Sequence, residues 1–524
     1  MTIETDSAEV RNAQRREQHH EADVVIVGAG VFGCAAAYAL ANQGRSVILL
    51  ERWMHEPDRI VGELLQPGGL QALQKLGLGH CVEGIDAITC YGYHVVFHGE
   101  EVAIPYPVVD DQGKVYSGEA AARVESTTTT TTSTPNGKTH NGPKLRRPEG
   151  RSFHHGRFIS QLRKACAAHP NITMFETTVT SVIRGSHSEQ VLGVETLTTD
   201  RETGEKQPDF FFGQLTLIAD GYDSKFRKQL LPSGTTPVVR SKFYALELID
   251  CPFPPSNYGH VVIGKTSPVL LYQIGTHETR ALIDIPHNLT AASAANGGVR
   301  GYIENIVVPT LPESVRPSVL ASLKDGKIPR SMPNSYLPAS GKANTSRTPG
   351  VLLLGDAYNM RHPLTGGGMT VAFSDVVLLA SLLHPDRVPN LADANAVEQA
   401  MKEFHWRRKA WTSIINTLAQ ALYSLFAADD WQLDALRKGC FAYFQMGGAK
   451  TDEPVALMGG LLHEPTVLAR HFFTVAFVAI WLHWCERVGS FWGLWKAPLL
   501  LVDAVLILWR ACVVFLPTIW KEAV

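Results

Sequence analysis

The chain lacks a concentration of positive charge, a cysteine framework and an N-terminal hydrophobic segment. Its 48 Lys and Arg are balanced by 50 Asp and Glu, which gives a formal net charge of −2. Nucleic-acid binding depends on clustered basic side chains, so no nucleic acid is expected as a partner. The eight cysteines include no CxxC pair and the twenty histidines no HExxH motif, so no metal site is predicted. Residues 1–22 are polar and lack a signal-peptide pattern, which predicts a flexible tail.

Apolar residues gather instead near the C-terminus, in two segments at about 467–485 and 497–520. Neither is an uninterrupted apolar run of the ~20 residues that a spanning helix prefers. The second contains Asp503 and Arg510, which would need partners in a membrane, and a pair of buried core helices is the alternative. Six Trp between positions 481 and 520 are typical of a membrane interface. The sequence therefore favours a C-terminal membrane anchor, monotopic or spanning.

A polar insertion separates two stretches of more ordinary composition. Residues 115–150 contain six consecutive Thr and few apolar side chains. Such a segment cannot bury enough apolar surface to offset the entropy of ordering it. We expect a disordered insertion within a single architecture, because similar motifs resume on both sides.

The strongest local pattern is a dinucleotide-binding motif near the N-terminus. An apolar strand at 23–27 leads into GxGxxG at 28–33, then a helix, then a second strand at 47–50 that ends at Glu51. In such a turn Gly28 permits the tight bend, Gly30 lets the backbone approach a pyrophosphate, and Gly33 allows the helix to pack on the strand. The helix N-terminus binds phosphate and Glu51 accepts hydrogen bonds from a ribose. The acid does not distinguish NAD from FAD.

Two later junctions indicate FAD. An apolar strand at 211–219 is followed by Asp220 and Gly221, and a strand at 351–354 by Gly355 and Asp356. The sequence HPLTGGGMT at 362–370 then opens a helix. A second strand–glycine–helix junction predicts a site for the far end of a long dinucleotide, where consecutive glycines approach an anion or a flavin edge. A helix N-cap or turn acid is the alternative for Asp356.

The order of these motifs resembles the FAD-dependent monooxygenases of the para-hydroxybenzoate hydroxylase type. Three longer blocks resemble, more narrowly, the fungal form of the squalene epoxidase (squalene monooxygenase) family. They are EPDRIVGELLQPGG at 56–69, FHHGRF at 153–158 and GDAYNMRHPLTGGGMT at 355–370. The resemblance implies an α/β fold with a Rossmann-like, glutathione-reductase-type FAD-binding domain, a β-sheet substrate domain and C-terminal membrane-associated helices.

The resemblance also implies an arrangement along the chain. A discontinuous FAD-binding domain is expected over 23–98, 151–235 and 345–395, a β-rich substrate domain over 236–344, and a helical region over 396–524. Strand-like segments between 243 and 285 are expected to form the wall of a substrate pocket.

Site residues follow from the positions that match the family motifs. Those assigned to the cofactor are Gly28, Gly30, Val31, Phe32, Gly33, Glu51, Arg59, Arg157, Val179, Asp220, Gly355, Asp356, Gly368 and Met369. The resemblance places Val31 and Phe32 against the adenosine diphosphate, Arg59 and Arg157 at the phosphate or ribityl region, and Asp356 and Met369 at the ribityl-isoalloxazine part. Tyr93 is expected beside the flavin and the substrate channel, with Gln66 hydrogen-bonded to it. A surface ion pair is the alternative for either arginine, and a core ring for Tyr93.

The implied reaction is epoxidation of squalene to (S)-2,3-oxidosqualene in sterol biosynthesis, through a flavin C4a-hydroperoxide formed with O2. Squalene has no polar group, so its site must be apolar and its binding must come from burial, at ~25 cal/mol per Å². The alternatives are another membrane flavoenzyme, such as a prenyl reductase or aromatic hydroxylase, and a non-enzymatic lipid carrier on an FAD fold.

The family implies an electron donor and a location. No second GxGxxG follows a predicted strand, so NADPH must bind transiently or a partner must deliver its electrons. The family's partner is NADPH–cytochrome P450 reductase. The family also implies the endoplasmic reticulum (microsomal) membrane or lipid droplets, with the catalytic body on the cytosolic face and membrane lipid around the C-terminal anchor.

Overall fold

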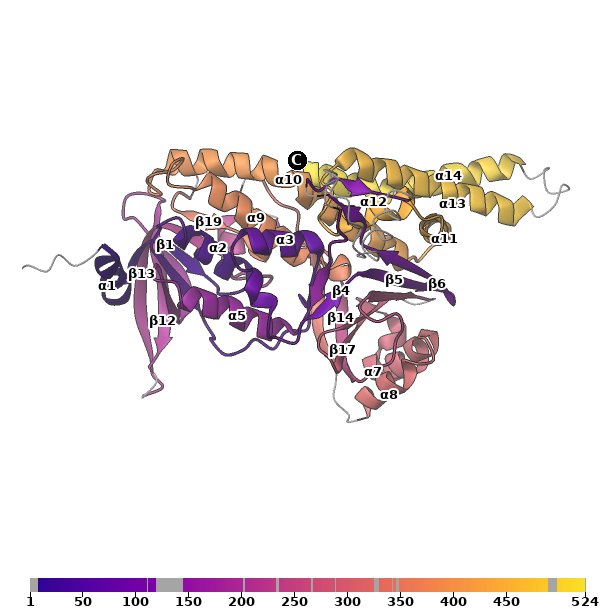
Figure 1. Cartoon of the computed structure of the whole chain (residues 1–524), viewed down its shortest axis with the longest axis horizontal. Coiled ribbons are helices and arrows are strands. Elements are labelled where there is room, and N and C mark those ends of the chain that lie inside the picture. Colours follow the sequence, from indigo (N-terminus) through magenta and orange to yellow (C-terminus); the bar gives the residue numbers. More distant parts are fainter. Residues whose placement is uncertain are drawn as a thin grey trace, which may run out of the picture.

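The computed structural model describes residues 8–523 except 111, 119–144, 201–202, 232–234, 265–266, 288, 325–328, 342, 345–347 and 489–496. The Thr-rich centre of the predicted insertion lies outside the described residues. The molecule is elongated, with an α/β part at one end, a second sheet beyond it and the C-terminal helices along one side (Figure 1).

A seven-stranded sheet forms the core of the first part. Its strand order is β10-β2-β1-β13-β12-β11, and β19 also pairs with β13. β10, β2, β1, β13 and β19 run parallel to their neighbours in this set, as the apolar runs followed by glycine turns predicted. The strands are β1 (Glu21–Val27), β2 (Val47–Glu51), β10 (Ile172–Glu176), β11 (Thr178–Arg184), β12 (Val191–Thr199), β13 (Lys206–Ile218) and β19 (Val351–Leu353).

Helices α2 (Val31–Ala41), α3 (Pro67–Lys75), α5 (His155–Ala167) and α9 (Gly368–Leu382) pack around this sheet. The centre of α2 is almost entirely small residues, and Cys34, Ala35 and Ala37 are fully buried. This lets α2 contact both α5 and α9. The short helices η1 (Gly79–Val82), α6 (Arg227–Leu230), η6 (Gly355–Ala357) and η7 (Pro363–Thr365) complete this part.

The prediction of a flexible tail over residues 1–22 is wrong from residue 8 onward. Residues Ala8–Gln18 form helix α1, and β1 begins at Glu21. Arg16 is buried, and its Nε donates to Thr173 Oγ1 at 2.9 Å. A polar sequence can therefore dock when its long side chains reach acceptors distant in the sequence, which a local pattern does not reveal.

The second sheet has the order β18-β14-β17-β16-β15-β5-β6. Residues 92–97, expected in the FAD-binding domain, instead belong to this sheet, because β5 pairs in parallel with β15. One face packs against α7 (Gly298–Tyr302), η4 (Ile303–Val307) and α8 (Arg316–Leu323). The other face packs toward the C-terminal helices. The strands are β5 (Gly92–Phe97), β6 (Glu100–Pro105), β14 (Val238–Ile249), β15 (Gly259–Ile263), β16 (Val269–Gln273), β17 (Glu278–Pro286) and β18 (Arg330–Tyr336).

Both ends of the predicted insertion are structured, so its limits of 115 and 150 were too wide. β7 (Val108–Val109) pairs with β8 (Val115–Tyr116), and Arg146 bridges to Val109. β9 (Gly150–Ser152) joins β3 (Leu64–Leu65) and β4 (Ile88–Cys90) in a small sheet. The insertion therefore leaves the body from a defined hairpin.

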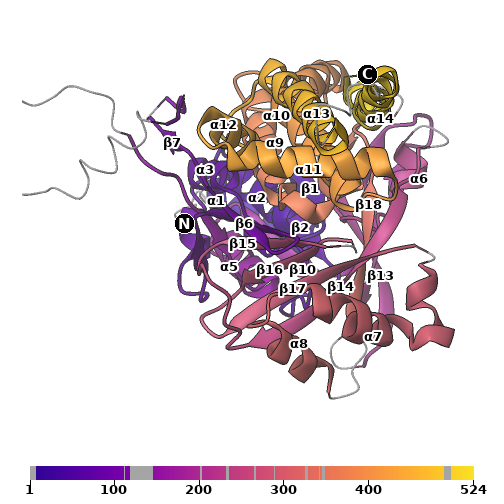
Figure 2. The same cartoon turned by 90° about the vertical axis from the view of Figure 1, so that its right-hand side faces the viewer.

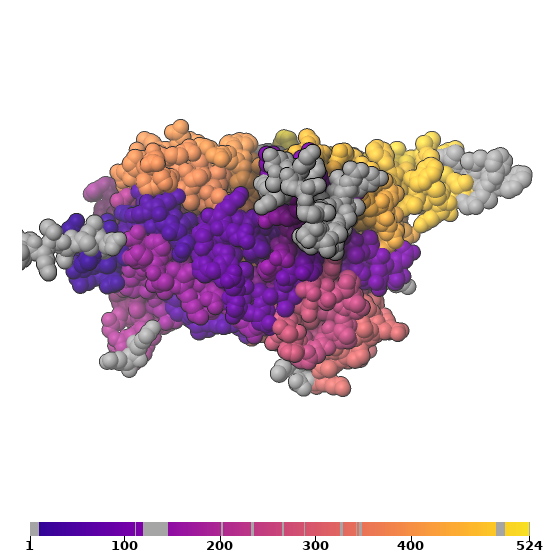
Figure 3. Space-filling view, viewed as in Figure 1, coloured from indigo at the N-terminus to yellow at the C-terminus, as the bar shows by residue number. Residues whose placement is uncertain are grey.

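Among the described residues, the C-terminal region contains the helices α10 (Ala394–Phe426), α11 (Trp431–Gln445), α12 (Ala449–Met458), α13 (Pro465–Val488) and α14 (Ala497–Ala523). Within the described chain, α13 and α14 are the two helices long and apolar enough to cross a membrane, with mean hydropathies of 1.5 and 2.5. They match the predicted segments to within three residues. The pair lies along one side of the body, projects past the sheets, and returns so that the C-terminus lies near α10 (Figures 1, 2 and 3).

Candidate active site

One pocket is lined by residues from both sheets. Its wall includes Gly30, Val31 and Phe32 from the first glycine turn and Gly355, Asp356, Gly368 and Met369 from the late one. A Cβ added at Gly355 would lie 3.1 Å from that of Phe32. Two junctions more than 300 residues apart in the sequence are thus in contact, as the prediction of one long dinucleotide site required.

The first glycine turn is fixed by the acid at the end of β2. Glu51 Oε2 accepts from the backbone N–H of Ala29 at 2.8 Å and lies 3.3 Å from Arg163 NH2. Arg163 also donates from Nε to the Ala29 carbonyl at 2.9 Å. Sequence analysis missed Arg163, which lies mid-helix in α5 with no motif around it. Glu51 therefore supports the turn from the strand end, just outside the pocket lining.

The late junction is held through its backbone. Arg227 donates to the carbonyl oxygens of Ala357 at 2.9 Å and Asp356 at 3.1 Å. The Asp356 side chain faces Arg59 at 3.9 Å. No side chain caps η6 or α9, so the N-cap alternative for Asp356 is wrong. Its carboxylate is available to a ligand in the pocket.

Tyr93, from β5, reaches the pocket through a hydrogen-bonded cluster. Gln66 Nε2 donates to Tyr93 Oη at 2.6 Å and to the Thr365 carbonyl at 2.8 Å, and Tyr106 Oη donates to Gln66 Oε1 at 2.6 Å. The predicted Gln66–Tyr93 hydrogen bond is confirmed, whereas Tyr106 was missed. Burial raises the pKa of Tyr93, so its hydroxyl stays protonated.

The remaining polar groups on the wall carry little net charge. His155 Nδ1 donates to the Gly62 carbonyl at 2.8 Å, and burial, assisted by the positive charge of Arg59, lowers the pKa of His155 to about 3. Arg280 binds buried Glu63 through Nε and NH2, at 3.0 and 2.9 Å. The deeper wall is apolar and consists of Val61, Leu64, Val261, Leu270, Leu282, Met332 and Leu364.

Several predicted residues lie away from the pocket wall. Arg157 lies near Asp86 and Glu278 at 3.9 and 4.0 Å, the surface arrangement that was its alternative. Val179 is buried in the core of the first sheet. Gly28 and Gly33 contact each other beneath the turn. Asp220 accepts from the Lys225 N–H at 3.1 Å, one residue before Gly221, which does line the pocket.

The residues present fit an extended, anionic cofactor. A Cβ at Gly30 or Gly368 would meet no atom within 4 Å, so both backbones face open space in the pocket. The Nε atoms of Arg59 and Arg361 are buried without a hydrogen-bond partner among the described residues. The first turn of α2 contains no acidic residue, and its N–H groups can bind phosphate.

Comparison with known proteins gives concordant results. A family model described as "Squalene epoxidase" matches residues 212–495, and one described as "FAD dependent oxidoreductase" matches residues 23–56. The chain is 60% identical to squalene epoxidase ERG1 of Gibberella zeae, over 97% of each chain. It is 41% identical to the squalene monooxygenase of Mus musculus, over 95% of this chain and 78% of the relative.

Solved structures share the fold. The flavin-dependent brominase Bmp2 aligns over 89% of this chain and 99% of its own, with a TM-score of 0.59 and 14% identity. PqsL of Pseudomonas aeruginosa, described as a probable FAD-dependent monooxygenase, aligns over 78% of this chain and 97% of its own, with a TM-score of 0.56 and 19% identity. These likenesses show that the chain shares this overall fold.

Proposed function

The chain belongs to the squalene epoxidase family, and on that basis we propose how its pocket holds FAD and squalene. It is an FAD-dependent monooxygenase that epoxidises squalene in sterol biosynthesis. The observation that carries the assignment of the pocket is that both glycine turns and the apolar face of the second sheet line it together.

FAD lies along the wall formed by the two turns. When bound, it supplies the redox chemistry that activates oxygen. Gly30, Val31 and Phe32 hold the diphosphate end, where the α2 N-terminus offers free N–H groups, and Glu51 receives the ribose. Asp356 and Met369 hold the ribityl and ring end. Arg59 neutralises the diphosphate, which its buried, unpartnered Nε favours.

Squalene occupies the apolar wall beyond the ring. Leu270, Leu282 and Met332 come from the second sheet and bury the hydrocarbon, the only driving force that such a substrate offers. His155 is neutral and Glu63 is paired with Arg280, so these groups add no net charge beside the alkene. Tyr93, held by Gln66, fixes the boundary between ring and substrate. The expected product is (S)-2,3-oxidosqualene.

Epoxidation places one atom of O2 on the alkene and releases the other as water, so two electrons must be supplied. We assign them to NADPH, delivered by cytochrome P450 reductase. In support, residues 21–41 are the one strand–GxGxxG–helix unit in the part of the chain that the structure describes. A membrane reductase and a hydrocarbon substrate place the reaction at the endoplasmic reticulum surface, with the body on the cytosolic face.

The protein is membrane-associated through α13 and α14. We propose a monotopic hairpin, because the part of α14 from Ile507 onward packs on the body. Leu500, Ile507 and Phe515 are buried on one face, and Arg510 lies 2.8 Å from Asp430 of the body. The opposite face exposes a continuous apolar stripe at Leu499, Leu501, Val502, Val505, Leu506, Trp509, Val513, Leu516 and Trp520, which suits the plane of a bilayer surface.

A labelling experiment distinguishes a monotopic from a spanning hairpin. Cys485 is exposed near the far end of α13. In proteoliposomes with the body outside, an impermeant maleimide is expected to label Cys485 without permeabilisation, and the Cys485→Ser variant supplies the background. Labelling that requires detergent would place the turn across the bilayer and contradict the proposal.

Turnover by the purified chain tests the proposed function. Detergent-solubilised protein with FAD, NADPH, P450 reductase and squalene is expected to form 2,3-oxidosqualene that carries one atom of ¹⁸O from ¹⁸O2. Squalane, which has the same skeleton without alkenes, should compete for the site without being oxidised. A flavin-loaded, reducible protein that incorporates no label would refute the assignment of substrate and donor.

Replacement of Gln66 tests the cluster that holds Tyr93. Gln66→Ala leaves the Tyr106 hydroxyl without its acceptor, a loss of about 1–3 kcal/mol. Tyr93→Phe removes one hydroxyl, while Gln66 keeps its bonds to Thr365 and Tyr106. We therefore expect Gln66→Ala to lower thermal stability and squalene turnover more than Tyr93→Phe does, measured by thermal shift and product formation. The reverse order would show that the Tyr93 hydroxyl, not the Gln66 amide, organises the site.

A further inference from the structure

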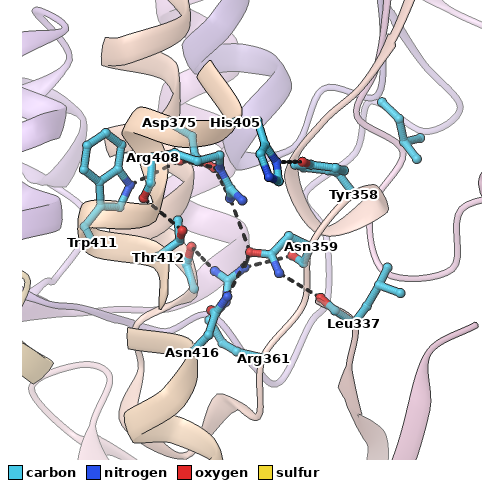
Figure 4. Close-up of polar contacts among 12 residues, drawn as sticks. Leu337, Tyr358, Asn359, Arg361, Asp375, His405, Arg408, Trp411, Thr412 and Asn416 are labelled. Carbon is cyan, nitrogen blue, oxygen red and sulfur yellow. Dashed lines mark hydrogen bonds and ion pairs between the residues drawn. The ribbon is translucent and has the colours of Figure 1, made fainter. Parts of the chain in front are cut away.

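A buried polar network lies directly behind the pocket wall, and Asn359 is at its centre (Figure 4). Asn359 Oδ1 accepts from Arg361 NH2 at 3.1 Å, Arg408 NH2 at 3.3 Å and Asn416 Nδ2 at 3.2 Å. Its own Nδ2 donates to the Leu337 carbonyl at 2.7 Å. The network thus joins the segment after Asp356 to helix α10.

The network holds two buried guanidinium groups, and the first has a local partner. Arg408 binds Asp375 of α9 through Nε and NH2, and Trp411 Nε1 donates to the same carboxylate at 3.2 Å. This pairing leaves Arg361 as the cation of the network without an ion-pair partner among the described residues. A buried charge without a counter-charge is strongly destabilising.

The second carboxylate comes from the other end of the chain. Glu522, in the last turn of α14, is buried, with 4% of its surface exposed. Its Oε1 accepts from Tyr336 Oη at 2.9 Å and its Oε2 from Asn416 Nδ2 at 3.1 Å. Its field acts on both Arg361 and Arg408. Burial raises the pKa of Glu522, and the positive charges of Arg408 and Arg361 oppose that effect. The membrane hairpin thus supplies a carboxyl group that joins the network through Asn416.

Arg361 connects this network to the cofactor site. It lines the pocket, and its NH1 donates to the carbonyl of Gly368 at 3.3 Å, at the start of α9. Burial lowers the pKa of Arg361, and the negative charges of Asp356, Asp375 and Glu522 oppose that effect. The position of this part of the wall thus depends on the hydrogen-bonded network that Glu522 completes.

We propose that Glu522 is a positioning residue for the FAD site, so that docking of the hairpin end and binding of FAD stabilise each other. The proposal rests on FAD lying in the pocket as described above. Without the Glu522 carboxylate, Tyr336 and Asn416 lose an acceptor, and the network that positions Arg361 on the pocket wall is no longer fixed. FAD binding would then depend on whether the end of the hairpin is docked on the body.

The test compares Glu522→Gln, Glu522→Asp and Lys521→Ala in the full-length, detergent-solubilised protein. Lys521 is exposed one residue away and serves as the control. Glu522→Gln replaces an acceptor oxygen with a donor, so Asn416 or Tyr336 loses its partner and the network that holds Arg361 shifts. Glu522→Gln is therefore expected to weaken FAD binding about tenfold. The loss of one negative charge is expected to make the flavin midpoint potential more positive. Glu522→Asp should restore the potential, and Lys521→Ala should change neither.

An effect on thermal stability alone, with unchanged FAD affinity and potential, would show that Glu522 is merely structural. A second measurement needs no variant, in case Glu522→Gln fails to fold. Because coupling is reciprocal, adding FAD to the wild-type apoprotein should slow hydrogen exchange in residues 515–522 of α14. Unchanged exchange there, with normal protection of the two glycine turns, would overturn this inference while leaving the proposed function intact.

Discussion

Replacing Gly30 by Ala is expected to leave the chain folded while abolishing tight FAD binding. The backbone of Gly30 is extended, with φ −90° and ψ −164°, which any residue adopts. A Cβ there would meet no protein atom within 4 Å and would project into the pocket. The methyl group would occupy the space through which a diphosphate approaches the α2 N-terminus. Loss of one or two charge-assisted hydrogen bonds corresponds to about a hundredfold weaker binding or more.

Gly33→Ala supplies the contrast. A Cβ at Gly33 would lie 1.8 Å from the Gly28 carbonyl oxygen, so the turn itself could not form. This variant is expected to be unstable with or without cofactor. Flavin absorbance per chain after gel filtration, together with circular dichroism, separates the two effects. A Gly30→Ala protein that is purified fully loaded with FAD would show that no phosphate lies against this turn.

The parts of the site that could be predicted from the sequence are those whose conformation is determined by a few consecutive residues. Glycine spacing encodes both turns, and residues 56–69 contain both Arg59 and Gln66 in one recognisable block. The parts that were missed depend on partners distant in the chain. Arg163 and Arg227 each hold a glycine junction through backbone carbonyls. Arg163 lies in no distinctive motif. Arg227 ends the segment that begins with Asp220 and Gly221, but the local pattern gives no sign that its side chain reaches the late junction.

The same reason explains the errors in the fold. β5 joins the second sheet by pairing with β15, which lies more than 160 residues later, and its alternation of side chains is compatible with either sheet. Asp503 and Arg510 looked costly in an apolar helix. In the structure Asp503 lies 2.8 Å from Arg487 and Arg510 lies 2.8 Å from Asp430. The two charged residues that interrupt the apolar helix therefore form ion pairs with neighbouring helices, and an apolar pattern in the sequence does not predict such contacts.

Asp356→Ala is expected to remove FAD and squalene turnover while preserving the fold. The turn around Asp356 is held by Arg227 through main-chain carbonyls, so it does not depend on the carboxylate. The side chain has no interaction nearer than Arg59 at 3.9 Å among the described residues. Its removal therefore costs the protein little. A carboxylate that accepts from a ribityl hydroxyl contributes about 1.5–3 kcal/mol, so FAD affinity should fall about ten- to 150-fold.

Asp223→Ala is the matched control, because Asp223 is an exposed carboxylate that also acts electrostatically on Arg227. It removes the same charge from the neighbourhood without facing the pocket, so its FAD content and turnover should equal those of the wild type. Titration of each apoprotein with FAD, followed by flavin fluorescence, gives the two dissociation constants. Equal dissociation constants for FAD in the two variants would mean that Asp356 affects FAD only through its charge and makes no direct hydrogen bond to it. A loss confined to Asp356→Ala would place the ribityl chain against the late glycine turn and thereby fix the direction in which the cofactor lies.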